Sequence, residues 1–218
     1  MADGLFLAYS DPGPVPEDEF HDWYDNEHLP ARLTVPGFES AARYRAADGQ
    51  MPPWLAVYEI EPGTLDSPAY KALYANNSDR EKSILSRLAT LDRREYVLIS
   101  DERPAGSQAG SSAASGAAPA ILAVSLSMQP GAEDDMNAWY AQEHTAMLLA
   151  VPGWRRVRRY RLTSGTGLEY LALHDVDGLS AFDSDAYKAA VSTPWRDRVL
   201  QQATGRERRV FSLYKSFG

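Results

Sequence analysis

The sequence contains no cysteine, which excludes disulfide bonds, thiolate zinc sites and a cysteine nucleophile. No apolar stretch approaches the ~20 residues that a membrane-spanning helix needs. The first residues also lack the basic segment and apolar run of a signal peptide. From these absences we expect a cytoplasmic protein with no membrane partner.

Positive charge is scarce as well. The chain has 22 Lys and Arg residues and 30 Asp and Glu residues, which gives a net charge of −8. A nucleic-acid surface needs a concentrated basic footprint. The short basic runs, such as Arg155-Arg156, alternate with apolar residues and are typical of a strand's outer face. We therefore expect no nucleic-acid partner.

Cofactor signatures are also missing. The sequence has no glycine-rich phosphate loop, no dinucleotide fingerprint, no Ser/His/Asp motif and no pair of histidines at ligand spacing. We expect no metal and no cofactor. Apolar residues make up 44% of the chain and aromatic residues 11%, which is enough for a folded core.

What the chain does have is an internal repeat. Shifted against itself by 116 residues, it is identical at 13 of the 30 positions from 17 to 46, where unrelated segments would match at roughly 2. The recurring pieces in the first copy are Glu17-Asp18, Trp23-Tyr24, Glu27-His28, Val35-Pro36-Gly37 and Arg43-Tyr44-Arg45. We predict two copies of one unit, 1–102 and 119–218, joined by a flexible Gly/Ser/Ala linker over 103–118.

Each copy predicts the same order of elements. In the first, strands are expected over 5–10, 38–46, 54–60 and 96–100, with helices over 16–33 and from 67 or 68 to about 91. The order βαββαβ is ferredoxin-like. A four-stranded sheet with helices on one face leaves its other face bare. We therefore predict an α+β fold in which two ferredoxin-like repeats pack sheet to sheet as an intramolecular pseudo-dimer.

The motifs Trp-Tyr-x-x-Glu-His, Val-Pro-Gly and Arg-Tyr-Arg, present in both copies, resemble the dimeric α+β barrel superfamily and within it the EthD-like branch. The resemblance covers about 100 residues in each unit. It implies a barrel made by two units and a ligand cavity between each sheet and its helices. It also implies a choice among cofactor-free monooxygenases, cyclases, decarboxylases, dehydratases, isomerases and haem-dependent proteins. Whether the tandem chain dimerises again stays open.

His28 is the sharpest catalytic candidate. It shares a helix face with Trp23 and Tyr24, and an imidazole suits proton transfer near neutral pH. Pro30 is expected to kink or end this helix near His28, whereas Ala146 lets the second copy run straighter. The structural alternative is that His28 bonds a strand carbonyl and holds the helix end.

Tyr58 and Arg43 complete the predicted catalytic set, as groups that steady an oxyanion. The acidic stretch Glu17–Asp25 is interpreted as a solvated helix start, His21 as exposed, and Glu27 and Glu143 as ion-pair partners of Arg43 and Arg159. The predicted substrate-binding residues form mostly aromatic walls and are Tyr9, Trp23, Tyr24, Trp54, Tyr140, His144 and His174.

The copies differ around this helix. Asp22, Asp25, Pro30 and Arg32 are replaced by alanine or leucine in the second copy, and Tyr58 becomes His174. We expect a functional site in copy one and a degenerate one in copy two.

Three functional hypotheses follow. The first is a cofactor-independent enzyme that uses acid/base chemistry for cyclisation, dehydration, decarboxylation or isomerisation of a small hydrophobic aromatic or polyketide-type ligand. The second is a non-catalytic ligand-binding or accessory protein. The third is a haem-binding or oxygenase-type protein with His28 or His174 as the axial ligand.

Overall fold

The computed structural model describes residues 3–104, 106 and 116–217. Most of the predicted linker, 103–118, lies outside the described residues. The chain divides into two compact units. Unit 1 comprises the residues up to Val97 together with Thr163–Thr166 and the C-terminal residues from Tyr214, and unit 2 comprises Leu98–Leu162 and Gly167–Leu213.

The first repeat has the predicted order of elements. They are β1 (Gly4–Asp11), α1 (Glu17–Trp23), a π-helical turn (Tyr24–His28), α2 (Leu29–Leu33), β2 (Phe38–Ala46), β3 (Trp54–Ile60), α3 (Pro68–Ala75), α4 (Asp79–Arg87) and β4 (Thr90–Glu102). One expected helix is two, α3 and α4, because Ser67 and Ser78 each cap a new helix start with their side chains. Leu91 therefore lies on β4 and not on a helix.

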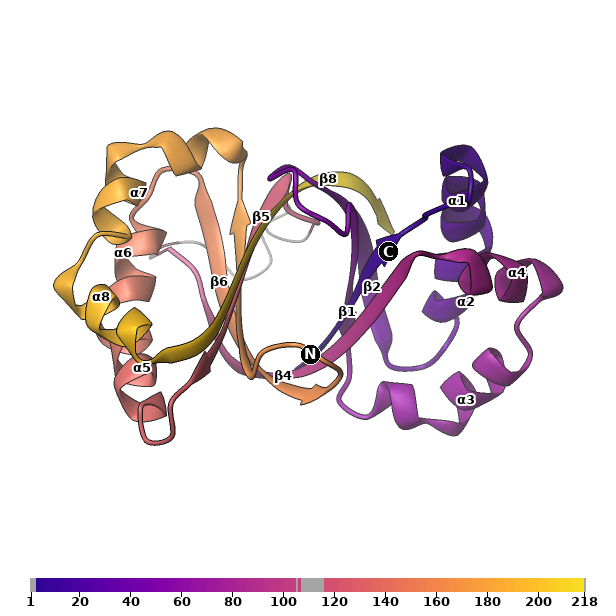
Figure 1. Cartoon of the computed structure of the whole chain (residues 1–218), viewed down its shortest axis with the longest axis horizontal. Helices are drawn as coiled ribbons and strands as arrows, with labels where there is room; N and C mark the ends of the chain where they lie inside the picture. Colours follow the sequence, from indigo (N-terminus) through magenta and orange to yellow (C-terminus); the bar gives the residue numbers. More distant parts are fainter. Residues whose placement is uncertain (1–2, 105, 107–115, 218) are drawn as a thin grey trace. The chain divides into compact units, whose positions relative to one another are not determined.

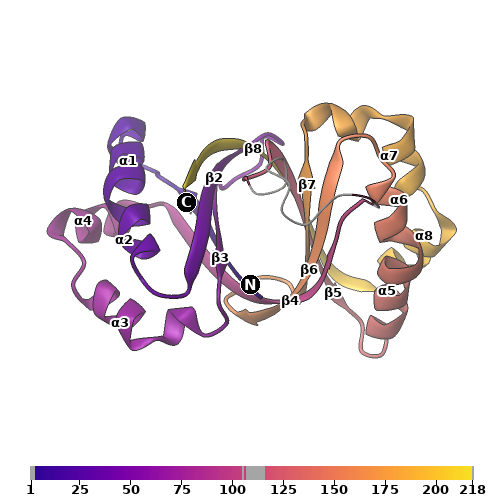
Figure 2. The same cartoon turned by 180° about the vertical axis from the view of Figure 1, so that it is seen from behind.

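The second repeat gives the same order. Its elements are β5 (Ala120–Met128), α5 (Glu133–Trp139), a π-helical turn (Tyr140–His144), α6 (Thr145–Leu149), β6 (Trp154–Ser164), β7 (Tyr170–Val176), α7 (Asp185–Ala190), α8 (Pro194–Gln201) and β8 (Ala203–Phe217). In both units the helices lie together on one face of the sheet (Figures 1 and 2).

The strands follow the order β1-β3-β2-β8-β5-β7-β6-β4 in a closed barrel, and the pairings within each repeat are antiparallel. The predicted α+β class with ferredoxin-like repeats and a barrel is confirmed. No helix in the described part of the chain is long and apolar enough to cross a membrane.

Strand alternation sorts the side chains of unit 1 between the two sheet faces. Phe6, Ala8, Trp54 and Tyr58 face the helices and join one core cluster with Phe20. A bulge in β2 between Phe38 and Ser40 shifts the alternation by one residue. This shift puts the odd-numbered Arg43 on the same helix-facing side as the even-numbered Phe38, and β6 repeats the bulge after Trp154.

The repeated Val-Pro-Gly has a steric basis. Gly37 has φ +99°, which side chains rarely adopt, and a Cβ there would overlap the side chain of Thr64. Glycine is thus required where the chain turns from α2 into β2.

Candidate functional site

His28 stands at the end of the π-helical turn between α1 and α2. Its ring lies 4.5 Å from that of Trp23 and 4.7 Å from that of Tyr24, centroid to centroid, and 7% of the residue is exposed. Such turns are rare and often mark functional sites. The expectation that Pro30 breaks the first helix and that the second copy runs straighter is wrong, because the same turn occurs at Tyr140–His144 without proline.

A buried hydrogen-bond network holds His28. Its Nδ1 lies 3.1 Å from Glu81 Oε1 on α4, and Arg32 Nη2 donates to the same oxygen at 3.4 Å. Arg32 Nη1 also donates to the carbonyl of His28 at 3.0 Å. The ring of His28 is therefore held by a carboxylate and not by a strand carbonyl. Its Nε2 makes no hydrogen bond to another of the described residues.

The charges of this network favour a neutral imidazole. Burial, and next the charge of Arg32, lower the pKa of His28 to about 4, although Glu81 opposes this. Burial alone would raise the pKa of Glu81, but the hydrogen bond from His28 and the charge of Arg32 hold it below its usual value. At neutral pH, Nδ1–H then donates to an ionised Glu81, and Nε2 carries a free lone pair.

Tyr24 and Tyr58 form a second polar pair. Their hydroxyl oxygens lie 3.1 Å apart in the buried core. Burial raises the pKa of Tyr24, and it raises that of Tyr58 well above the usual range. Both phenols therefore stay protonated and can act only as hydrogen-bond donors or acceptors.

The guanidinium of Arg43 does not lie where the predicted catalytic role would require it. Its guanidinium pairs with Asp25 and His21 and lies within 5.3 Å of four ring centroids, those of Phe20, Tyr24, Trp54 and Tyr214. Only 1% of Arg43 is exposed, so it positions Tyr24 instead of meeting a ligand. His21 is only partly exposed, because it stacks on Tyr214 with ring centroids 4.7 Å apart, and Asp25 is buried.

The expected ion pairs of Glu27 and Glu143 with Arg43 and Arg159 are wrong. Glu27 instead accepts a hydrogen bond from Ser78, the N-cap of α4, and Glu143 accepts one from Thr193, the N-cap of α8. The glutamate of each Glu-His pair thus anchors a helix start, while Arg159 donates to Asn137. This structural task explains why the glutamate occurs in both copies.

His28 lines one small cavity, which borders a larger one. The small chamber of about 40 Å³, lined by His28, Tyr24 and Arg32, shares Phe6, Tyr74 and Arg93 with the larger cavity of about 890 Å³. The larger volume lies in the usual range for ligand sites, ~300–1,000 Å³. His28 thus stands behind the inner wall of a cavity of ligand size.

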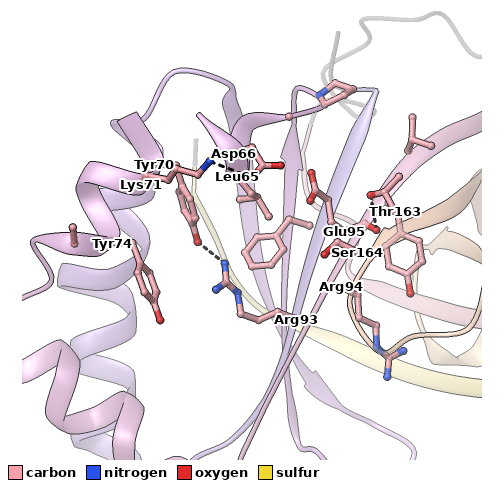
Figure 3. A pocket seen from close by; sticks show the side chains of 16 residues that line it. Leu65, Asp66, Tyr70, Lys71, Tyr74, Arg93, Arg94, Glu95, Thr163 and Ser164 are labelled. Atoms are coloured by element: carbon pink, nitrogen blue, oxygen red, sulfur yellow. Dashed lines mark hydrogen bonds and ion pairs between the residues drawn. The ribbon is translucent and has the colours of Figure 1, made fainter. Parts of the chain in front are cut away.

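Figure 3 shows the larger cavity between α3 and β4. Arg93 on β4 donates to the hydroxyl of Tyr70 at 2.6 Å, and its guanidinium lies 5.1 Å from the ring centroid of Phe6. Glu95 follows two residues later on the strand, and burial, and next the charge of Asp66, raise its pKa. The cavity therefore combines aromatic walls with basic side chains, those of Lys71, Arg93 and Arg94, and with the carboxyl group of Glu95, whose pKa is raised.

The predicted substrate-binding residues of unit 1 do not lie in one common site. Trp23 and Tyr24 line the small chamber. Trp54 belongs to the cage around Arg43. Tyr9 lies on the opposite face of β1, with Arg94 4.5 Å from its ring centroid, so it does not meet His28.

The corresponding cavity of unit 2 holds the other three, Tyr140, His144 and His174, in about 40 Å³. His144 has no carboxylate partner, because the third position after the helix N-cap is Glu81 in α4 but Arg196 in α8. Leu148 likewise stands where unit 1 has Arg32. The network that holds His28 is therefore missing from unit 2.

Four residues of the site escaped the sequence analysis: Glu81, Arg32 as part of a network, Tyr70 and Arg93. Ser78-Asp-Arg-Glu81 has the pattern of a helix capping box. That pattern predicts a bond from Glu81 back to its own helix start, whereas the carboxylate turns to His28. Tyr70 and Arg93 recur as Tyr187 and Arg208, which was a usable signal.

No family model and no curated protein matches this sequence. Solved structures do match over nearly the whole chain. An anthrone oxidase-like protein has 14% identity and a TM-score of 0.64, with 98% of this chain and 92% of that chain covered. A mutant chlorite dismutase from Candidatus Nitrospira defluvii, in complex with cyanide, has 11% identity and a TM-score of 0.57, with 97% and 90% covered.

A third match is an uncharacterized ferredoxin-fold protein related to antibiotic biosynthesis monooxygenases, from Listeria monocytogenes. It has 9% identity and a TM-score of 0.50, with 99% of this chain and 96% of that chain covered. At such low identities these matches establish the fold alone, an α+β barrel of ferredoxin-like repeats.

Proposed function

We propose that unit 1 is a cofactor-independent enzyme that moves a proton on a small, hydrophobic, oxygenated ligand, with His28 as the general base. The observation that carries this proposal is the hydrogen bond between His28 Nδ1 and Glu81, which leaves Nε2 free at a chamber bordering the 890 Å³ cavity. An imidazole held by a carboxylate through one nitrogen is a standard arrangement for proton transfer through the other.

The step uses the surrounding groups as follows. Nε2 of His28 takes a proton from an acidic C–H or O–H of the ligand, and the electron pair moves onto the ligand's carbonyl oxygen. Arg93 and the Tyr24 hydroxyl face the same chamber and stabilise that oxyanion. Glu81 keeps the imidazole oriented and favours the imidazolium that forms. Return of the proton to another atom completes an isomerisation or starts an elimination.

The aromatic side chains of Phe6, Tyr70 and Tyr74 in the lining of the larger cavity support a ligand of aromatic or polyketide type, and the charged side chains beside them suit its oxygen atoms. The similar anthrone oxidase-like and monooxygenase-related structures are compatible with such a ligand. Membership of the EthD-like branch and a lyase or cyclase reaction are part of the same proposal and stay predictions.

Neither His28 nor His174 is placed to ligate a haem. His174 is 1% exposed and packs against Trp154, with ring centroids 5.4 Å apart, and Nδ1 of His28 is engaged by Glu81. Axial ligation brings the haem plane against the imidazole, whereas proton transfer needs only the acidic group of a ligand at the ring. The chambers that these histidines line measure about 40 Å³ each, which admits such a group but not a haem.

Deuterium uptake tests the proposal without a known product. Aryl ketones with an acidic C–H are incubated with the protein in D₂O, and exchange is followed by ¹H NMR. We expect His28→Gln to slow exchange at least about 100-fold with an unchanged melting temperature, whereas His144→Gln, the matched control at the corresponding position of unit 2, retains the rate. Equal rates in both variants would exclude His28 as the base. Ligand binding with no exchange in the wild type would favour the ligand-binding hypothesis.

The pH dependence gives a second test. Because the pKa of His28 is about 4, its base form dominates throughout the neutral range. We expect the exchange rate constant to stay constant between pH 7.5 and 5.5. If the base were a histidine with an ordinary pKa, the exchange rate constant would fall about tenfold over that interval. Glu81→Gln should lower the rate and change this profile, which a purely structural role would not do.

A further inference from the structure

The cavity around His144 in unit 2 is lined by basic groups without acidic ones. The basic residues are His144, His174, Arg196, Arg206 and Arg208, and no Asp or Glu is among its lining residues in the described chain. The rest of the lining is apolar or aromatic and includes Leu122, Val124, Leu126, Leu148 and Tyr140. His144 and His174 are buried in this cavity, whereas Arg196 is partly exposed and Arg206 is exposed. A negative group that enters the cavity therefore meets basic side chains and no acidic side chain among the lining residues.

The basic groups of this cavity lower one another's pKa values. Burial, and next the charge of Arg206, lower the pKa of Arg196. Burial, and next Arg196, lower the pKa of His144 to about 3. Burial, and next His144, lower that of His174 to about 3 as well. In the described part of the chain, Arg196 forms an ion pair with Asp197 at 3.6 Å, whose side chain is mostly exposed and is therefore a weak counterion.

Two buried polar atoms in this cavity are unpaired. Among the residues that the structure describes, Nδ1 of His144 and Nδ1 of His174 have no hydrogen-bond partner, and the two residues are 7% and 1% exposed. A hydrogen bond to the backbone of Ala190 partly opposes the lowering of the His144 pKa. Buried nitrogens of this kind are rare without a partner. A bound anion would favour the protonated ring, in which each Nδ1–H can donate.

We propose that the unit 2 cavity is a binding site for a short-chain monocarboxylate, whose carboxylate lies against Arg196 and Arg206 and whose tail meets the leucines. Arginine is suited to this task because its planar fork matches a carboxylate. The volume of about 40 Å³ limits the ligand to a few heavy atoms, since one water needs ~10–15 Å³. The apolar walls favour an acid with a hydrocarbon tail over inorganic phosphate. This site does not depend on the function proposed for unit 1.

A propionate titration of the full chain with ¹⁵N-labelled histidine tests the proposal, at constant ionic strength with chloride as the balancing ion. We expect the ring nitrogens of His144 and His174 to shift, while those of His28 stay unchanged. Shifts confined to His28, no saturable shift, or tighter binding of phosphate than of propionate would overturn it.

Variants of Arg196 sharpen the test, because this side chain is on the rim of the cavity and its loss is compatible with folding. We expect Arg196→Gln to weaken propionate binding by about 10- to 100-fold and Arg196→Glu to abolish it. Arg155→Gln, which removes an exposed arginine paired with Asp177, is the matched control and should leave the affinity unchanged. Equal affinities in all three variants would show that Arg196 does not hold the anion.

Discussion

Lowering the pH from 7 to 4 should unfold the protein, because three buried histidines must take up protons that the folded state resists. The pKa of His28 is lowered to about 4 and those of His144 and His174 to about 3, each mainly by burial. The unfolded chain has a histidine pKa of ~6.5. The stability that these neutral rings provide is therefore complete above pH 6.5 and is lost as the pH falls toward 4.

The size of the effect follows from proton linkage. Between pH 6.5 and 4, each of these histidines binds up to one more proton in the unfolded state, which lowers the free energy of unfolding by up to about 1.4 kcal/mol per pH unit. Three such residues together approach or exceed the ~5–15 kcal/mol by which domains are usually stable. Glu81 adds to the loss at the acid end, because its pKa is lowered in the folded state and its contribution disappears as it is protonated.

Urea unfolding at pH 7, 6.5, 6, 5.5 and 5, followed by circular dichroism, measures this dependence. We expect His174→Tyr, which introduces the residue that unit 1 has at this position, to reduce the slope by up to about 1.4 kcal/mol per pH unit. His21→Gln should change the slope less, because that ring is only partly buried. A free energy of unfolding that is constant from pH 7 to 5 would contradict the lowered pKa values.

The repeat made the fold predictable from the sequence. Strand and helix periodicity are local properties of the sequence. Because the chain contains two copies of one unit, the pattern of each element occurs twice and each copy supports the prediction from the other. Only the second helical region and the π-helical turns were missed. The serine side chain that starts α4 competes with helix continuation, and no local signal distinguishes a π-helical turn from ordinary helix.

The site was harder to predict because its partners are distant in sequence. Glu81 lies 53 residues from His28, and its spacing from Ser78 is that of a local helix cap, which gives no indication of a distant partner. Arg43 was placed by a bulge in β2, which reverses the face that plain alternation assigns. One wall of its cage comes from Tyr214, near the other end of the chain. Residue types indicated the chemistry of His28, but only the fold shows what orients it.

The second large effect concerns the pair of Asp25 and Arg43. Arg43 is 1% exposed and Asp25 9%, so removing the carboxylate leaves a buried guanidinium without its main counterion. We expect Asp25→Ala to lower the free energy of unfolding by about 3–5 kcal/mol, as measured by urea unfolding at pH 7. The control Asp22→Ala breaks the exposed pair with Arg80 and should lower the free energy of unfolding far less, because both side chains are solvated.

Unit 2 shows how the fold accommodates the same arginine without this carboxylate. Arg159 lies 4.1 Å from the ring centroid of Tyr140, with Ala141 at the position of Asp25 and Asn137 at that of His21. Asn137 accepts a hydrogen bond from Arg159 at 2.7 Å. Adding His21→Asn to Asp25→Ala should therefore recover about 1–2 kcal/mol by giving Arg43 a neutral acceptor. If the double variant is no more stable than Asp25→Ala, the asparagine in unit 2 does not replace the lost carboxylate, and another feature of that unit keeps Arg159 buried.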